Sequence, residues 1–199
     1  MFVKSITPEE IELMERAAFP GEIVVVDKLG KDFNDAVEYL GSQKIIGFDT
    51  ESRPSFSPGQ PHYGVSLLQL SGEEKAFLFR IKLMGLQRSV CNILANPDII
   101  KVGAAVYDDI RGLKRYCSFQ DKGFVDLQKI VEEYGITDKS VKKMAAIILG
   151  LKVSKTQQLS NWEAEVLTDP QKMYAATDAW VCLKMYNKLM VSEKNPIVK

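Results

Sequence analysis

Short runs of apolar residues, separated by polar turns, dominate the first half of the chain and predict β-strands. The runs are rich in β-branched and aromatic residues, which favour strands over helices. They comprise residues 22–27 (EIVVVD), 44–49 (KIIGFD), 65–71 (VSLLQLS), 75–81 (KAFLFRI) and part of 99–106 (IIKVGAAV). A tight turn at residues 72–74 joins the third and fourth runs into a predicted strand pair.

Apolar residues elsewhere recur at the spacing of amphipathic helices. The predicted helices cover residues 6–19, 31–41, 85–96, 108–117, 124–135, 140–150 and 169–190. Thr7 and Pro8 suit the start of the first helix, and Gly41 suits the end of the second. Strands that cluster early and then alternate with helices predict a layered α/β domain with a mixed sheet. We expect one domain over residues 1–199, with a short helical extension at its first 20 or so residues.

The composition is that of an ordinary globular protein. The chain has 199 residues, of which 46% are apolar and 26% charged, and this length is sufficient to bury a core. The longest apolar run, at 144–151, is much shorter than the roughly 20 residues of a membrane-spanning helix. Acidic residues near the N-terminus argue against a secretion signal. The three cysteines form no CxxC pair, so we expect a reduced, cytoplasmic chain without a zinc knuckle.

The net charge is zero, which argues against a globally basic nucleic-acid-binding protein. The charge is unevenly distributed, however, because residues 139–199 contain ten lysines and only five acidic residues. This lysine-rich part is interpreted either as a solvated helix surface or as a guide for a nucleic-acid backbone.

Two carboxylates lie close together at the end of the second predicted strand. Asp49 and Glu51 are two residues apart, so in a strand both side chains point to the same face. Like charges held close together are unfavourable unless something neutralises them. Carboxylate oxygens are the ligands that Mg²⁺ and Mn²⁺ prefer, so the pair is a candidate metal site as well as a candidate solvated loop pair.

Two further acidic positions follow along the chain. Asp108 and Asp109 lie where a predicted strand passes into a helix, and one could cap the helix while the other points inward. On the last predicted helix, Tyr174 and Asp178 are four residues apart and share one face. That pair is either a catalytic pair or a structural hydrogen bond.

The order of these sites is more informative than any one of them. A DxE at a strand end, an aspartate in a later helix and a YxxxD on the last helix resemble the DEDD superfamily of 3′–5′ exonucleases, in its tyrosine subtype. This superfamily includes ribonuclease D, the proofreading domain of DNA polymerase I and the Werner-type exonuclease domain. The run LSNWEAEVLTDPQKMYAATDAW, at 159–180, is especially similar to the Werner-type branch. The resemblance extends roughly from Val24 to Leu189 and implies a ribonuclease H-like mixed β-sheet flanked by helices.

The resemblance carries over residue by residue. Asp49 and Glu51 match the first motif, and Asp178 matches the third. Asp109 rather than Asp108 matches the second, because the family aspartate is usually followed four residues later by leucine, as here by Leu113.

Tyr174 matches the tyrosine of the subtype. Met173 occupies the position that is histidine in the other subtype, and the only histidine is His62. The chain departs from the pattern at 103–105, where Gly-Ala-Ala replaces a polar run that many members carry. Substrate contacts at that place are therefore not carried over.

The resemblance implies phosphodiester hydrolysis with two Mg²⁺ or Mn²⁺ ions. Asp49 would bridge both ions, Glu51 and Asp178 would complete the ion on the side of the nucleophile, and Asp109 would hold the other. Tyr174 would orient the attacking water.

Contacts to the substrate are expected at four positions, with the backbone of Thr50 meeting the terminal 3′-OH. The four expected nucleic-acid-binding residues are Thr50, Arg53, Asn161 and Trp162. Trp162 is also interpreted as a packing residue. The loop from Arg53 to His62 could meet phosphates, and Phe56 and Tyr63 either stack on unpaired bases or pack within the loop.

Three functions remain open from the sequence. The leading one is removal of nucleoside monophosphates from the 3′ end of DNA. A ribonuclease D-like exoribonuclease would use the same residues. A non-catalytic nucleic-acid-binding module is the third, although such a module would be expected to have lost one of the four carboxylates or the tyrosine.

Overall fold

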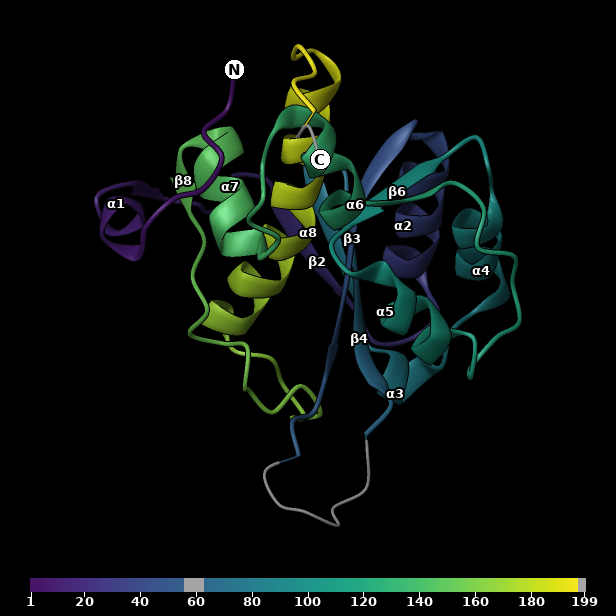
Figure 1. Cartoon of the computed structure of the whole chain (residues 1–199). Helices are drawn as coiled ribbons and strands as arrows, with labels where there is room; N and C mark the ends of the chain where they lie inside the picture. The colour runs from purple at the N-terminus through teal and green to yellow at the C-terminus, as the bar shows by residue number, and fades with distance from the viewer. Residues whose placement is uncertain (56–62, 197–199) are drawn as a thin grey trace.

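A six-stranded mixed sheet lies at the centre of the protein (Figure 1). The structure, a computed structural model, describes residues 1–55 and 63–196. In the order in which they lie side by side, the strands are β2 (Glu22–Val26), β5 (Lys75–Phe79), β4 (Val65–Ser71), β3 (Ile45–Ser52), β6 (Ile100–Gly103) and β7 (Phe124–Asp126). Strand β4 is antiparallel to both of its neighbours, and the remaining neighbours pair in parallel. The predicted layered α/β fold with a mixed sheet is confirmed.

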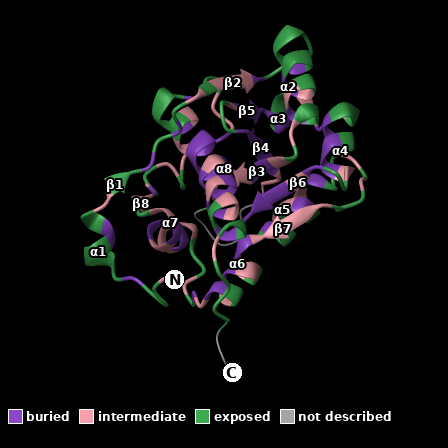
Figure 2. Ribbon diagram, turned by 90° about the horizontal axis from the view of Figure 1, so that it is seen from above, coloured by how far each residue is buried: buried purple, intermediate pink, exposed green. Residues whose placement is uncertain are grey.

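Helices cover both faces of this sheet. They are α2 (Lys31–Ser42), α3 (Ile81–Met84), α4 (Arg88–Ala95), α5 (Val106–Leu113), α6 (Leu127–Ile130), α7 (Val141–Leu149) and α8 (Asp169–Met190), with a 3₁₀ turn at Val131–Tyr134. Apolar residues of α2, α4 and α5 pack in one cluster with the strands. Residues of α6, α7 and α8 form a second cluster. Figure 2 shows β4 between these layers, and every residue of β4 is buried.

The long helix α8 lies directly against β3. Ala175, Ala176 and Ala179 are fully buried and bring the helix close to the sheet, as their small size predicts. At Gly47 of β3, the methyl group of an alanine would lie only 1.9 Å from the carbonyl oxygen of Ala179. Only glycine therefore fits at this position, and the close contact fixes α8 relative to the end of β3.

The N-terminal segment is a short helix followed by a strand, rather than the single helix predicted for 6–19. Helix α1 (Pro8–Glu12) begins with the expected cap, in which Thr7 and Glu10 form a capping box. The chain then pairs as β1 (Glu15–Arg16) with β8 (Leu151–Lys152) in a separate two-stranded sheet. The prediction was wrong here because a tertiary strand pairing overrides the helix propensity of residues 13–18.

Other element boundaries also differ from the prediction. The segment 124–135 begins with strand β7 and only then becomes helical, because Phe124 and Val125 extend the sheet beside β6. Asp126 caps the turn that follows by accepting a hydrogen bond from the backbone N–H of Gln128 at 3.0 Å. Helix α2 continues through Gly41 to Ser42, so Gly41 does not end it.

The cysteines lie in two places that the sequence did not indicate. The sulfur atoms of Cys91 and Cys117 lie side by side at the position of a disulfide, whereas Cys182 is free and buried. The reduced state and the cytoplasmic location stay predictions. Among the described residues, no helix combines the length and the apolar character that crossing a membrane requires.

Candidate active site

Three carboxylates from two elements meet at the end of β3. Strand alternation turns Ile46, Phe48 and Thr50 to one face and turns Asp49 and Glu51 to the face that α8 covers. Asp178, on the side of α8 that faces the sheet, is buried and completes the group. One carboxylate oxygen from each of Asp49, Glu51 and Asp178 lies within 4.8 Å of the other two.

Asp109 lies apart from this group but is connected to it through β3. Its Oδ1 atom accepts a hydrogen bond from the hydroxyl group of Thr50 at 2.5 Å. Thr50 stands between Asp49 and Glu51 in the strand. Thr50, which lies between the two acidic residues of β3, therefore holds Asp109 at the opposite face of the same strand end.

The neighbouring Asp108 points away from the site. Its side chain is 77% exposed and forms an ion pair with Arg111 at 3.0 Å. Neither aspartate caps α5, which corrects the expected cap. The helix begins at Val106 after Ala105, whose φ of 58° is left-handed, and the Ala105 N–H donates to Asp126 at 3.0 Å. The inward side chain is thus that of Asp109, as the leucine spacing predicted.

The two acids of β3 are strongly disfavoured as a pair of free anions. Burial raises the pKa of Asp49 well above its ordinary value, and the nearby charges of Asp178 and Asp109 raise it further. Burial, followed by the charges of Asp49 and Asp178, raises the pKa of Glu51 from 4.5 to about 10. In the absence of a cation, the site therefore retains protons at neutral pH.

Asp178 and Tyr174 lie one helical turn apart and affect each other's ionisation. Burial raises the pKa of Asp178 to about 7, against the opposing effects of the Tyr174 hydroxyl and of the Lys155 charge. Burial and the charges of Asp178 and Glu51 raise the pKa of Tyr174 far above its ordinary value. The phenol of Tyr174 consequently stays protonated around neutral pH and acts only as a neutral hydroxyl group.

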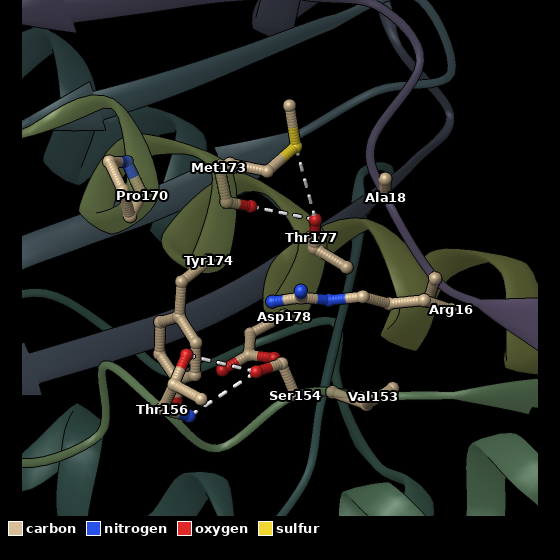
Figure 3. Close-up of a pocket in the computed structure, with 11 residues that line it drawn as sticks. Arg16, Ala18, Val153, Ser154, Thr156, Pro170, Met173, Tyr174, Thr177 and Asp178 are labelled. Carbon is tan, nitrogen blue, oxygen red and sulfur yellow. Dashed lines mark hydrogen bonds between the residues drawn. The ribbon is translucent and has the colours of Figure 1, made fainter. Parts of the chain in front are cut away.

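Two adjoining cavities open at these residues. One, of about 260 Å³, contains the three carboxylates, Tyr174 and Lys155. The other, of about 350 Å³, lies on the far side of Tyr174 and Asp178 and reaches the N-terminal segment (Figure 3). The acidic group is therefore accessible to a ligand from outside the protein.

Lys155 is a residue of this site that the sequence patterns do not single out. It is one of the many lysines of residues 139–199, most of which form ion pairs on the surface. Lysines of this region that pair with acidic residues are Lys139, Lys142, Lys143, Lys152, Lys172, Lys184 and Lys194. Lys155 instead lines the cavity with the carboxylates. The only sequence feature that distinguishes Lys155 is its position just before the run at 159–180 that resembles the Werner-type branch.

Two of the predicted substrate contacts lie at the surface near the site. Arg53 is exposed and forms an ion pair with Glu163 at 3.7 Å, with its guanidinium group 4.9 Å from the ring centre of Tyr63. Asn161 is also exposed, and its side-chain oxygen accepts a hydrogen bond from the Glu163 N–H at 3.1 Å. To bind a substrate, Arg53 and Asn161 would have to give up their contacts with Glu163.

Trp162 cannot meet a substrate, which corrects its inclusion among the nucleic-acid contacts. Its side chain is fully buried and packs against Tyr174 with ring centres 5.9 Å apart. The packing interpretation of Trp162 is the one that fits, because the indole supports the ring that carries the Tyr174 hydroxyl. Phe56 and His62, also expected near a substrate, lie outside the described residues.

The donor set suits a divalent cation. Asp49, Glu51 and Asp178 offer hard oxygen ligands within a small volume, as Mg²⁺ and Mn²⁺ sites require. No described lysine or arginine forms an ion pair with these three carboxylates. Burial raises the pKa of all three carboxyl groups, and the charges of neighbouring carboxylates raise the pKa of Asp49 and Glu51 further. A bound cation would oppose both effects.

Comparison with known proteins finds one family over most of the chain. Residues 26–192 match the family described as 3′–5′ exonuclease. The chain is 31% identical over 195 residues to the bifunctional 3′–5′ exonuclease/ATP-dependent helicase WRN of Mus musculus, covering 94% of this chain and 14% of that protein. It is 27% identical over 179 residues to the exonuclease mut-7 homolog of Homo sapiens, covering 75% of this chain and 20% of that protein. The chain thus spans less than half the length of these relatives.

Solved structures share the fold. Escherichia coli RNase D, described as an exoribonuclease involved in structured RNA processing, has a TM-score of 0.75 at 22% identity, over 85% of this chain and 44% of that one. The Aedes aegypti Nibbler EXO domain has a TM-score of 0.71 at 22% identity, over 84% of this chain and 86% of that one. The likeness confirms the ribonuclease H-like architecture expected from the sequence.

Proposed function

The chain belongs to the 3′–5′ exonuclease family, and on this premise we propose that it hydrolyses the terminal phosphodiester bond at the 3′ end of DNA and releases nucleoside 5′-monophosphates. The observation that carries the proposal is the meeting of Asp49, Glu51 and Asp178 within 4.8 Å, beside the protonated Tyr174. Family membership agrees with the resemblance inferred from the sequence.

Exonuclease domains of this family use divalent metal ions, and we assign metal binding here to the carboxylates of Asp49, Glu51, Asp178 and Asp109. Two ions, Mg²⁺ or Mn²⁺, are proposed. When bound, such ions lower the pKa of a coordinated water and neutralise charge on the phosphate. The chain's own contribution is to hold three carboxylates together and a fourth beside them through Thr50. Among the described residues, no cationic side chain forms an ion pair with the central three.

Tyr174 positions the attacking water in this proposal. Its pKa is raised far above neutrality, so the hydroxyl keeps its proton and donates it in a hydrogen bond to Asp178, while the hydroxyl oxygen accepts a hydrogen bond from the water. The water gives up one proton to solvent as its oxygen adds to the phosphorus of the terminal phosphodiester. The O3′ atom of the preceding nucleotide leaves and is protonated from solvent.

Thr50 and Lys155 hold the substrate in this proposal. The backbone of Thr50 meets the terminal 3′-OH, while its side chain is bound to Asp109. Lys155 lines the cavity beside the carboxylates, where its ammonium group offers a counter-charge to a phosphate. Arg53 and Asn161, at the surface, are proposed as outer contacts.

RNA is the second candidate substrate. The run at 159–180 is similar to the Werner-type branch, which favours DNA. The curated relatives also include a ribonuclease D that is 22% identical over 178 residues, and a structural relative is described as an exoribonuclease. The carboxylates and the tyrosine would perform the same hydrolysis on either polymer.

The test is a time course on matched DNA and RNA oligonucleotides labelled at the 5′ end or the 3′ end, with Mn²⁺, with Mg²⁺ and with EDTA. The proposal expects 5′-labelled DNA to shorten one nucleotide at a time, and 3′-labelled DNA to release labelled mononucleotide at once. Faster cleavage of RNA would reassign the substrate. Binding without cleavage of either polymer in the presence of metal would identify a non-catalytic module and overturn the proposal.

A further inference from the structure

A second cavity borders the acidic site and is partly formed by residues outside the family match. The cavity of about 350 Å³ has the N-terminal residues Arg16, Ala17 and Ala18 along one wall and residues of α8 along another (Figure 3). This volume lies within the range of about 300–1,000 Å³ that is typical of small-molecule sites. The family match begins only at residue 26, so the N-terminal wall lies outside that match, although it lies within the likeness to WRN, which covers 94% of this chain.

The wall that carries Arg16 is firmly attached to the rest of the protein. Arg16 lies in β1, paired with Lys152 of β8, and the next backbone N–H, from Ala17, donates to the Lys152 carbonyl at 2.9 Å. The Phe19 N–H donates to the Thr177 hydroxyl at 3.0 Å, and the Phe19 ring is buried. The backbone at Arg16 is therefore held in place, and the exposed side chain extends into the cavity in Figure 3.

Arg16 has no acidic partner in the part of the chain that the structure describes. Four cationic side chains line a third cavity, of about 330 Å³, which shares Arg16 with the second one. Two of them, Lys142 and Lys152, are neutralised by Glu12 at 3.2 Å and 2.8 Å. Arg16 and Lys155 are the two that carry no ion pair among the described residues. Within this cavity, the positive charge available to an external anion is thus that of Arg16 and Lys155.

The second cavity adjoins the first at Tyr174 and Asp178 of α8. Tyr174 and Asp178 line both cavities, as do Val153 and Ser154. A ligand in the second cavity would therefore lie next to whatever occupies the acidic site. The remaining lining is largely apolar, with Ala18, Met173 and Pro170 among its residues.

We propose that this cavity is a second nucleotide-binding site, in which the Arg16 guanidinium group binds a phosphate and the apolar wall receives a base. The ligand is the nucleotide adjacent to the terminal one in the bound strand, or a released nucleoside monophosphate that has the same chemistry. A guanidinium group matches a phosphate with two parallel hydrogen bonds. The phosphate lies at the Arg16 side, because the carboxylate of Asp178 at the other side would repel it.

The inference rests on the proposed function, and its test separates the two. Kinetics are measured on a 5′-labelled oligonucleotide and on the p-nitrophenyl ester of thymidine 5′-phosphate, a small phosphodiester that needs only the acidic site. The variants are Arg16→Ala and Ala18→Leu, which fills the cavity from an exposed position. Arg115→Ala is the matched control, because Arg115 is exposed and lines none of these cavities.

The expected result is a fall of about tenfold in the ratio of kcat/KM for the oligonucleotide to kcat/KM for the ester, in both variants and mainly through KM. For Arg16→Ala, the slope of log KM against log salt concentration should decrease by about 0.7, the value for one phosphate of a single strand. Arg115→Ala should leave the ratio as in the wild type.

Binding measurements keep the test independent of turnover. Fluorescence anisotropy with the same oligonucleotide in Ca²⁺, and inhibition by thymidine 5′-monophosphate, are compared between wild type and Arg16→Ala. Weaker oligonucleotide binding assigns the site to the strand, and weaker inhibition by the mononucleotide alone assigns it to the product. Unchanged binding of both ligands, together with an unchanged kinetic ratio, overturns the inference. A wild-type protein that cleaves neither substrate overturns the proposed function instead, while the binding comparison still decides the inference.

Discussion

The hydroxyl group of Thr50 donates a hydrogen bond to Asp109 and thereby connects the two faces of β3 at the acidic site. Asp49 and Glu51 flank Thr50 and point to the face covered by α8. One strand end thus positions two carboxylates directly and a third through a side chain.

Removal of this hydroxyl should impair the site without unfolding the protein. Thr50→Val keeps the β-branched shape that suits a strand but leaves Asp109 without its donor. We expect activity to fall about 10–100-fold, as for loss of a group that orients a metal ligand. Thr50→Ser retains the hydroxyl and should restore most of the rate. Equal rates for the valine and serine variants in single-turnover cleavage would show that the hydrogen bond has no part in the reaction.

The two adjacent aspartates of α5 should behave differently. Asp109→Ala should abolish activity, because it removes an inward carboxylate. Asp108→Ala breaks only an exposed ion pair with Arg111, so stability should change by less than about 0.5 kcal/mol and cleavage should remain. Thermal unfolding and oligonucleotide cleavage are measured for both. An inactive Asp108→Ala together with an active Asp109→Ala would reverse the assignment.

Tyr174→Phe isolates the hydroxyl group. The variant keeps the ring that packs on Trp162, so stability should be nearly unchanged. Cleavage should slow roughly 10²-fold, as expected for one positioned catalytic group. Because the pKa of Tyr174 is raised far above neutrality, the wild-type pH–rate profile should contain no step from its ionisation.

Calorimetric Mn²⁺ titration separates this role from a structural one. Asp178→Asn should weaken Mn²⁺ binding, whereas Tyr174→Phe should not. Loss of metal in Tyr174→Phe would mean that the hydroxyl supports Asp178 rather than the attacking water.

The metal-free protein should lose stability as pH rises. The pKa of Glu51 is raised from 4.5 to about 10 in the folded state, so between these pH values the native state retains a proton that the unfolded state releases. The free energy of unfolding must therefore fall across this interval. In EDTA, we expect the Tm to decrease from about pH 5 towards pH 10 more steeply for wild type than for Glu51→Gln.

Addition of Mn²⁺ should reverse this loss at neutral pH in the wild type, since a ligand that binds only the native state raises its stability. Glu51→Gln should respond less. A wild-type Tm that is insensitive to both pH and Mn²⁺ would contradict the metal assignment.

Gly47 can be tested against a second glycine that has free space around it. A methyl group at Gly47 would meet the Ala179 carbonyl oxygen at 1.9 Å, whereas at Gly41 no atom lies within 4 Å. Gly47→Ala should destabilise the protein by about 1–3 kcal/mol and also reduce activity, because α8 must shift away from β3. Gly41→Ala, inside α2, should instead stabilise by about 0.5–1 kcal/mol. Chemical denaturation measures both.

Much of the site could be predicted from the sequence because its chemistry resides in local patterns. Asp49 and Glu51 are two residues apart, which predicted that they share one face of a strand. Tyr174 and Asp178 are four residues apart, which predicted that they share one face of a helix. Both relations hold in the structure. These two faces meet only because α8 packs on β3. The small residues of α8 indicated close packing but did not identify β3 as the partner.

The remaining features depend on long-range contacts that leave little trace in the sequence. Residues 13–18 have helical propensity, and only their pairing with β8 places Arg16 beside the acidic site. Phe124 and Val125 begin an apparent helix but extend the sheet. Lys155 resembles the other lysines around it, and nothing local separates it from those that pair with surface acids.

The attachment of the N-terminal segment has a consequence for anyone who trims this protein. A fragment cut at residue 26, where the family likeness begins, would lack Phe19, which packs against Trp180 with ring centres 6.1 Å apart. It would also lack the N–H that Thr177 binds. Both contacts lie on the helix that carries Tyr174 and Asp178, so the shortened fragment would expose an apolar surface on that helix. The boundary of the folded unit therefore precedes residue 26, and an inactive fragment cut at that residue would say little about the enzyme.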